Sequence, residues 1–259
     1  MKLTIIGCTG SMSGPDSAAS SYLVQADGAD PDGEVRTWSV VLDLGPGAMG
    51  QMLRYLDPID LDAILISHCH ADHIVDLVGM HVFRRWNPTG ALGPVLTLGP
   101  GELRGRLNGV DGTSPEETYA SEFSFRTAVV GQAVQVGPLK IMPYEALHPV
   151  EAYGYRIEAP GRDGRGSVSL AFTGDTDLCD GVEAAFLEGR DTYRGMHLTG
   201  RRAGELAAGT SGEGGRRPAG SLVLTHIQPW TDPADTLKEA AEVYSGPLEA
   251  AIAGASWEI

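Results

Sequence analysis

The sequence has 259 residues, of which 42% are hydrophobic, and a formal net charge of −15. A chain of this length can bury a large core and no linker divides it, so we predict one domain over residues 1–259. The acidic balance argues against binding to nucleic acid or an anionic membrane, because both depend on Lys and Arg. Three unpatterned cysteines and the lack of an apolar stretch near the roughly 18 residues that cross a bilayer favour a cytoplasmic protein.

The predicted elements are strands that come in runs and are broken by helices at intervals. This order predicts an α/β fold of two mixed sheets packed face to face, with helices outside. Hydrophobic periodicity and turn residues predict the strands at 3–8, 20–26, 37–44, 61–66, 94–98, 123–130, 133–136, 140–146, 153–158, 167–172, 222–225 and 248–252. The predicted helices span 48–56, 74–86, 200–208 and 233–244, and another begins near residue 101.

Four potential metal ligands lie where the predicted strand 61–66 ends and the following helix begins. In extended backbone, residues two apart point the same way, so His68 and His70 can bind one ion together. The chain then turns and can present Asp72 and His73 to a second ion. Two metals about 3.5–4 Å apart can hold both the attacking and the leaving oxygen of a displacement. Asp72 alone could cap the helix, but three imidazoles within six residues favour metal binding.

Three further candidate ligands, His148, Asp175 and His226, each follow a predicted strand. A lone residue of this kind is more often structural. At a strand end, however, loop side chains project from a rigid base. Together with the turn, these residues would supply three histidines to one metal, two to the other and a carboxylate shared by both.

This set, in this order, resembles the metallo-β-lactamase-fold hydrolases, and the resemblance spans nearly the whole chain. It implies a sandwich of two sheets flanked by helices and two divalent ions, Zn or Mn, with Fe as a further possibility. In that family, the positions matching His68, His70 and His148 hold the first metal, those matching Asp72, His73 and His226 hold the second, and the one matching Asp175 bridges the two.

Within that superfamily, the sequence is closest to the branch of tRNase Z and class II-like cyclic nucleotide phosphodiesterases. In this branch a glutamate orients a histidine that contacts the phosphate and can protonate the leaving oxygen, which implies these roles for Glu183 and His197; His197 could instead simply begin a helix. Asp43 resembles the family's aspartate that can fix the tautomer of a ligand histidine. The motifs that carry the resemblance are Gly7-Cys8-Thr9-Gly10-Ser11, Ser20-Ser21-Tyr22-Leu23, Val182-Glu183-Ala184-Ala185-Phe186 and His197-Leu198-Thr199-Gly200.

Further stretches look like a group of bacterial atypical class II cyclic AMP phosphodiesterases. One departure stands out: the family normally has a helix and a buried strand between the bridging aspartate and the glutamate motif. Asp175 and Glu183 are only eight positions apart, which cannot hold both, so we expect that a segment is missing from the sequence or that the chain lacks a core strand. The stretches in question are 13–17, 83–86, 148–154 and 225–230.

The leading hypothesis is hydrolysis of 3′,5′-cyclic AMP, or another cyclic nucleotide, to the 5′-monophosphate by a metal-activated water. Asp72 or Asp175 would orient the nucleophile and His197 would protonate the departing 3′ oxygen. The alternative is a tRNase Z-like endoribonuclease that processes tRNA 3′ ends. Against it, only 26 residues separate His148 from Asp175, where those enzymes insert a long basic arm, and the chain is acidic.

Two other classes fit the residues less well. Diiron redox proteins on this fold usually carry a glutamate at the position of His70, and carboxylates suit iron redox better than a first site made only of histidines. A non-catalytic metal scaffold would not need so complete a ligand set. We therefore expect a small cyclic nucleotide as partner, no nucleic acid and no membrane, and the family analogy implies a homodimer. The remaining histidine, His81, is predicted to be structural.

Overall fold

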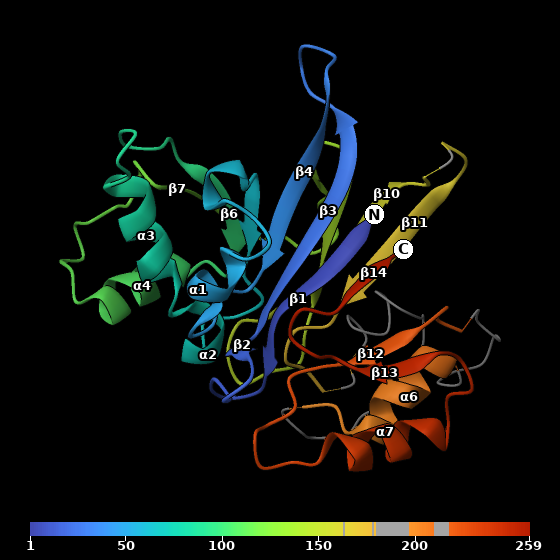
Figure 1. Ribbon diagram of the computed structural model, residues 1–259. Helices are drawn as coiled ribbons and strands as arrows, with labels where there is room; N and C mark the ends of the chain where they lie inside the picture. The colour runs from blue at the N-terminus through green and yellow to red at the C-terminus, as the bar shows by residue number, and fades with distance from the viewer. Residues whose placement is uncertain (163, 178, 180–196, 210–217) are drawn as a thin grey trace.

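The computed structural model describes residues 1–162, 164–177, 179, 197–209 and 218–259. Within these residues, two sheets lie face to face and four helices, α1 to α4, cover the outer side of the first sheet (Figure 1). The hairpin of β3 and β4 projects beyond the rest of the first sheet. Glu183 is among the residues that are not described.

The first sheet has eight strands, in which β4 to β7 run parallel and β1, β3 and β4 are antiparallel neighbours. Strand β5 is buried on both faces and its neighbours β4 and β6 are mostly buried where they pair with it, as expected for a sheet covered on each side, whereas the edge strand β7 is largely exposed. The strands in spatial order are β14 (Ser256–Glu258), β1 (Lys2–Thr9), β3 (Ser21–Ala29), β4 (Val35–Leu42), β5 (Ala63–Leu65), β6 (Val95–Gly99) and β7 (Phe123–Thr127), with the short β2 (Ala18–Ala19) paired to β1.

The described strands of the second sheet are all antiparallel. Their order is β11 (Ser167–Phe172), β10 (Tyr153–Pro160), β9 (Leu139–Glu145) and β8 (Val134–Val136). Two further strands, β12 (Leu222–Leu224) and β13 (Leu248–Ala250), form a separate parallel pair. Among the described residues, therefore, the C-terminal strands do not pair with the second sheet.

The core has two layers because side chains alternate along each strand of the first sheet. Val40 and Leu42 of β4 point to the second sheet, where they pack in one buried cluster with Ile141 and Ile157. Val41, between them, points the other way into a second cluster beneath the helices. Each such side chain, once buried, contributes about 1.5–3 kcal/mol to the stability of the sandwich.

Helices α1 to α4 cover the outer layer, and helices α6 and α7 pack beside β12 and β13. Helices α6 and α7 approach closely at Gly204, where an added Cβ would lie 2.7 Å from the carbonyl oxygen of Ala240. Among the described helices none has the length and apolar character of a membrane span. The helices are α1 (Ala48–Met52), α2 (Ala71–Ile74), α3 (Leu77–Arg85), α4 (Leu103–Asp111), α6 (Gly200–Ala208) and α7 (Pro233–Ala241), with a 3-10 turn η1 (Pro58–Asp60).

The expected layers are confirmed, and several elements differ from the expectation. The helix predicted over 48–56 ends at Met52, and the strand predicted over 123–130 ends at Thr127. The segment predicted as one helix over 74–86 is broken into α2 and α3, and α2 already begins at Ala71. Asp72 and His73 therefore lie in the first turn of a helix rather than before it. The strand predicted at 248–252 is also not the last, because β14 follows it and pairs antiparallel with β1.

Three isolated bridges tie loops from different sheets to one end of the sandwich. Ala152 pairs with His68, Leu147 pairs with Asp177, and Ile227 pairs with Thr9. The first bridge joins the loop that follows β9 to the loop that follows β5, the second joins the loops that follow β9 and β11, and the third joins the loop that follows β12 to the end of β1. Residues far apart in the sequence are thereby placed side by side.

Candidate metal centre

All seven residues predicted as metal ligands converge at this end of the sandwich, in two neighbouring groups. In each group, the potential ligand atoms all lie within 4.8 Å of one another. That the groups bind metal stays a prediction, but their chemistry is that of imidazole and carboxylate sites for divalent ions. The first group is His68, His70 and His148, and the second is Asp72, His73, Asp175 and His226.

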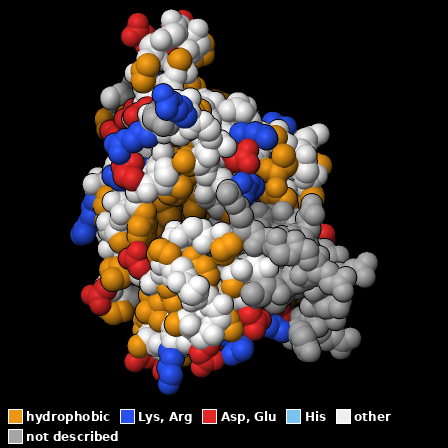
Figure 2. Space-filling model, turned by 90° about the vertical axis from the view of Figure 1, so that its right-hand side faces the viewer, with side chains coloured by type: hydrophobic (Ala, Val, Ile, Leu, Met, Phe, Trp, Pro, Cys, Tyr) orange, Lys and Arg blue, Asp and Glu red, His pale blue; other side chains and the backbone are white. Residues whose placement is uncertain are grey.

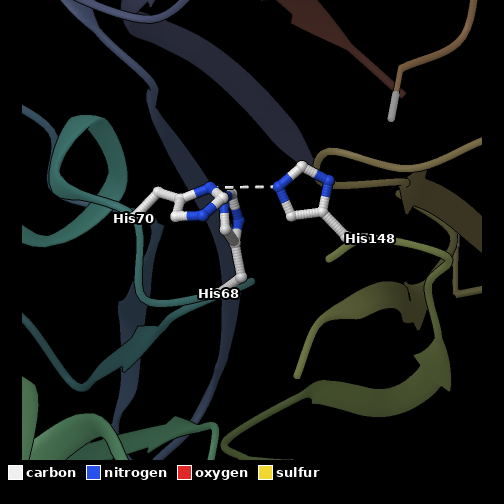
Figure 3. Close-up of side chains that lie close together, drawn as sticks. All are labelled: His68, His70 and His148. Carbon is white, nitrogen blue, oxygen red and sulfur yellow. Dashed lines mark hydrogen bonds between the residues drawn. The ribbon is translucent and has the colours of Figure 1, made fainter. Parts of the chain in front are cut away.

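The first group consists of three imidazoles whose ring nitrogens face one another (Figure 3). Nδ1 of His70 lies 3.0 Å from Nε2 of His68 and 3.0 Å from Nε2 of His148. Burial, together with the positive charge of His73, lowers the pKa of His68 to about 2. His68 is therefore neutral at physiological pH, the form in which imidazole binds a metal. Three converging imidazoles suit one divalent ion.

The second group combines two imidazoles with two carboxylates. Oδ2 of Asp175 lies 3.0 Å from Nε2 of His226 and 3.3 Å from Nε2 of His73, and Oδ2 of Asp72 lies 3.6 and 3.5 Å from the same two nitrogens. Burial would raise the pKa of Asp175, but His226 and His73 hold it well below its usual range. Both carboxylates are therefore ionised and available to a cation.

Whether the second group fits a metal can be judged from two buried ring nitrogens that lack a hydrogen-bond partner among the described residues. Nε2 of His73 and Nε2 of His226 are both buried and have no hydrogen-bond partner within the described part of the chain. A buried polar atom without a partner costs free energy, so native proteins satisfy almost all of them. Both nitrogens face the carboxylates of Asp72 and Asp175. A cation bound there would satisfy them, so the residues fit a second metal.

Asp43 contacts His73 at Nδ1, the ring nitrogen on the side away from the second group, and so orients the ring. Its carboxylate is fully buried, accepts hydrogen bonds from the backbone N and the Oγ of Ser67, and lies 2.7 Å from Nδ1 of His73. Ser67 Oγ in turn lies 3.1 Å from Nδ1 of His68. Burial lowers the pKa of His73, but the charge of Asp43 and the hydrogen bonds to Asp175, Asp43 and Asp72 together outweigh burial and raise that pKa well above the usual value. Metal binding at Nε2 of His73 would therefore displace a proton.

His197, predicted as the general acid, lies beside both groups. Its ring stacks on His226 at 5.6 Å and meets His148 edge-on at 5.5 Å, and its Nδ1 lies 3.6 Å from Oδ2 of Asp175. The side chain is 39% exposed, so a substrate can reach it. Glu183, its predicted partner, lies outside the described residues, and its role stays a prediction.

His81 belongs to neither group. It is buried in α3, where its ring packs edge-on against Tyr119 and Trp86 and its Nδ1 lies 3.6 Å from Glu122. These contacts are those of a structural residue, as expected.

Two hydroxyl groups that contact the rings of candidate ligands were not predicted from the sequence. Ser67 Oγ approaches His68, the next residue, and this adjacency could have indicated the contact. Ser20 Oγ lies 2.9 Å from Nδ1 of His226, a residue 206 positions away, which no local pattern reveals.

Two groups of imidazole and carboxylate ligands at one end of a face-to-face sheet sandwich define the class of protein, a metal-dependent hydrolase of the metallo-β-lactamase fold. The family model described as "Beta-lactamase superfamily domain" matches residues 38–227, so the chain belongs to this superfamily.

Two relatives are similar over the whole chain. The protein ML1173 of Mycobacterium leprae is 36% identical over 278 aligned positions, which cover 100% of this chain and 89% of that protein. The "Probable metallo-hydrolase YhfI" of Bacillus subtilis is 27% identical over 276 positions and covers 100% of both chains. Because this chain has 259 residues, at least 19 of the 278 positions in the first alignment have no counterpart here.

Solved structures show the same fold. The crystal structure of YhfI from Bacillus subtilis, a metallo-beta-lactamase fold protein, matches with a TM-score of 0.77 at 25% identity and covers 100% of this chain and 99% of that chain. Human tRNase Z, short form, matches with a TM-score of 0.67 at 17% identity, and unliganded yeast PDE1 with 0.68 at 12%. Each covers 100% of this chain and 99% of its own, and these two show likeness of fold alone.

Proposed function

We propose that the protein is a two-metal phosphodiesterase that hydrolyses 3′,5′-cyclic nucleotides, cyclic AMP first, to 5′-monophosphates. The observation that carries the proposal is the place of His197, an exposed imidazole in contact with His148 of one ligand group and His226 of the other. A phosphodiester held at both groups would present its leaving oxygen to a proton donor. This is the arrangement that general acid catalysis requires.

The residues divide the work as follows. Two divalent ions held by the two groups would activate the attacking water and neutralise charge that builds on the phosphorus oxygens. Asp72 and Asp175, both ionised, orient the attacking water through their carboxylate oxygens. His197 gives its proton to the departing 3′ oxygen, and Oδ2 of Asp175 lies 3.6 Å from its Nδ1. The single product is the nucleoside 5′-monophosphate, which carries a free 3′ hydroxyl.

Charge and loop length favour a small substrate over RNA. The chain has a net charge of −15, and on the face in Figure 2 its Lys and Arg side chains are scattered among Asp and Glu rather than gathered in a patch. Strands β10 and β11 form a hairpin in which Pro160 pairs with Ser167, so only a short turn joins them. RNA binding depends on an extended basic surface, and this hairpin leaves no room there for a long basic arm.

The fold itself is compatible with both substrate classes, because human tRNase Z and yeast PDE1 share it. A tRNase Z-like endoribonuclease is therefore the alternative that an experiment has to exclude. Location in the cytoplasm and assembly as a homodimer belong to the proposal too. The first agrees with the three free cysteines, Cys8, Cys69 and Cys179.

The test is to incubate the protein, loaded with Mn²⁺ or Zn²⁺, with 3′,5′-cyclic AMP and to separate the products chromatographically. We expect 5′-AMP, no 3′-AMP, and loss of turnover in His68→Ala. Cleavage of a precursor tRNA without turnover of cyclic AMP would establish the alternative. Turnover that survives His68→Ala would show that the site is not the one described.

A second substrate tests the role of His197. Bis(4-nitrophenyl) phosphate has a leaving group that departs without a proton, so His197→Ala should slow its cleavage far less than that of cyclic AMP. For cyclic AMP, the expected loss in kcat is about 10²- to 10⁴-fold. Equal losses on both substrates would contradict a proton-donating role.

A further inference from the structure

His226 is held in an unusual backbone conformation. Its φ of 59° lies in the left-handed region, which is uncommon for residues other than glycine. The end of β1 stabilises this turn, because the N–H of His226 donates to the carbonyl of Cys8 at 3.0 Å and the N–H of Gly10 donates to the carbonyl of Ile227 at 3.1 Å. Gly10 has to be glycine, since an added Cβ would lie 2.3 Å from the carbonyl oxygen of His226. One end of the first sheet thus supports a ligand from the C-terminal part of the chain.

The ring of His226 is held by Ser20. Ser20 is 1% exposed, and its Oγ lies 2.9 Å from Nδ1 of His226. A neutral imidazole carries one N–H, so a proton on Nδ1 that is donated to Ser20 leaves a lone pair on Nε2. That Nε2 is the buried atom that faces Asp72 and Asp175. The contact therefore selects the tautomer that a metal at the second group requires.

Ser20 is itself fixed on two sides. Its carbonyl accepts a hydrogen bond from the N–H of Gly45 at 3.1 Å, and its Oγ accepts one from the hydroxyl of the buried Tyr22 at 3.4 Å. The same Tyr22 hydroxyl lies 2.7 Å from Oγ1 of Thr225, the residue before His226. Gly45 also packs against the second group, because an added Cβ there would lie 2.0 Å from the carbonyl oxygen of Asp72.

We propose that Ser20 is a positioning residue for the second metal: it holds the ring of His226 with Nε2 free to bind, and Tyr22 holds Ser20 in place. This role would explain the Ser20-Ser21-Tyr22-Leu23 motif, none of whose residues takes part in the proposed reaction. It rests on the two-metal centre of the proposed function but not on its substrate. It can therefore be tested by metal binding alone.

The experiment compares Ser20→Ala with Ser21→Ala. Metal is removed by chelation, and Zn²⁺ is titrated back in competition with a chromophoric chelator that resolves the two sites. We expect Ser20→Ala to weaken one of the two sites by about 10- to 100-fold and to leave the other unchanged. Ser21 is a matched control, because it is equally buried, with 0% exposure, and its Oγ has no hydrogen-bond partner in the described part of the chain. Ser21→Ala should bind both ions as the wild type does.

Two more measurements separate positioning from folding. Ser20→Thr keeps the hydroxyl and should restore the affinity of the weakened site to within about threefold of the wild type, inside the range that such contacts control. Because Ser20→Ala removes buried contacts to His226 and Tyr22 and Ser21→Ala removes none, metal-free Ser20→Ala should melt at a lower temperature than Ser21→Ala but still in one cooperative transition. Wild-type affinity of both sites in Ser20→Ala, equal weakening of both sites, or loss of the cooperative transition in metal-free Ser20→Ala would each overturn the proposal. None of these outcomes depends on whether cyclic AMP is the substrate.

Discussion

Asp43→Asn is the substitution that tests most sharply how the ligand histidines are held. The side chain keeps its shape, and its amide oxygen can still accept from the N–H of Ser67, which lies 2.7 Å from Oδ1. Its amide nitrogen, however, replaces Oδ2, the atom 2.7 Å from Nδ1 of His73. The amide N–H of the new side chain then faces the N–H at Nδ1 of His73, and two donors cannot form a hydrogen bond. His73 can restore the bond only by moving its proton to Nε2, where the proton blocks the metal.

The magnitude follows from burial. Asp43 has 0% exposure and His73 has 1%, so water cannot replace the lost contact. A hydrogen bond to a charged group contributes about 1.5–3 kcal/mol, and we expect the free energy of unfolding of the metal-free protein to fall by that amount. Metal affinity should fall by about 10- to 100-fold, because the ring no longer presents Nε2 in the right tautomer.

Urea unfolding of metal-free protein and Zn²⁺ titration measure the two effects. Asp62→Asn is the matched control, since Asp62 also accepts from a backbone N–H, that of Ser39, and pairs with the partly exposed Arg36. This more exposed pair is screened by solvent, so its loss should cost less than about 1 kcal/mol and leave metal binding unchanged. If Asp43→Asn unfolds like Asp62→Asn and binds two ions normally, the account of the buried network is wrong.

Three other predictions concern Gly10, Cys69 and the removal of metal. Gly10→Ala should lower the free energy of unfolding by about 1–3 kcal/mol because the added Cβ meets the backbone of His226. Gly105→Ala is the control: Gly105 lies in α4, an added Cβ there has nothing within 4 Å, and the substitution should not destabilise the protein. Urea unfolding of the two variants measures the difference. Burial raises the pKa of Cys69 to about 12, so its thiol stays neutral and unlabelled by iodoacetamide at pH 8 until the protein unfolds, and mass spectrometry of labelled native protein would reveal any exception. Chelation should lower the melting temperature, and an unchanged value would argue against bound metal.

The convergence of the seven candidate ligands could be predicted because each carries a local signal. His68 to His73 lie together beside a buried strand, and His148, Asp175 and His226 each follow a strand, so the pattern needs no knowledge of tertiary contacts. The start of α2 could not be predicted correctly: the hydrophobic pattern predicts a helix from residue 74, and α2 begins at Ala71. No side chain caps its N-terminus at His70, so the usual capping signal is missing.

The contacts behind the ligands could not be predicted, because they join distant parts of the chain. The pairing of Ser20 with His226 depends on the end of β1 meeting the turn after β12, a consequence of the whole topology. Strand β14 was missed for a similar reason. It is three residues long and is defined by its pairing with β1 rather than by a hydrophobic pattern of its own.

The short spacing between Asp175 and Glu183 predicted either a missing segment or a missing core strand. That prediction stays open. Among the described residues, β12 and β13 form a sheet separate from β11, and the alignment with ML1173 is at least 19 positions longer than this 259-residue chain.

The central claim is that seven side chains form two metal sites, and metal content tests it most directly. After dialysis against a Zn²⁺ buffer, elemental mass spectrometry should find two ions per chain in the wild type. His148→Ala removes a ligand of the first group only and His226→Ala one of the second only, so each variant should retain one ion. Fewer than two ions in the wild type, or both ions retained in either variant, would contradict the account.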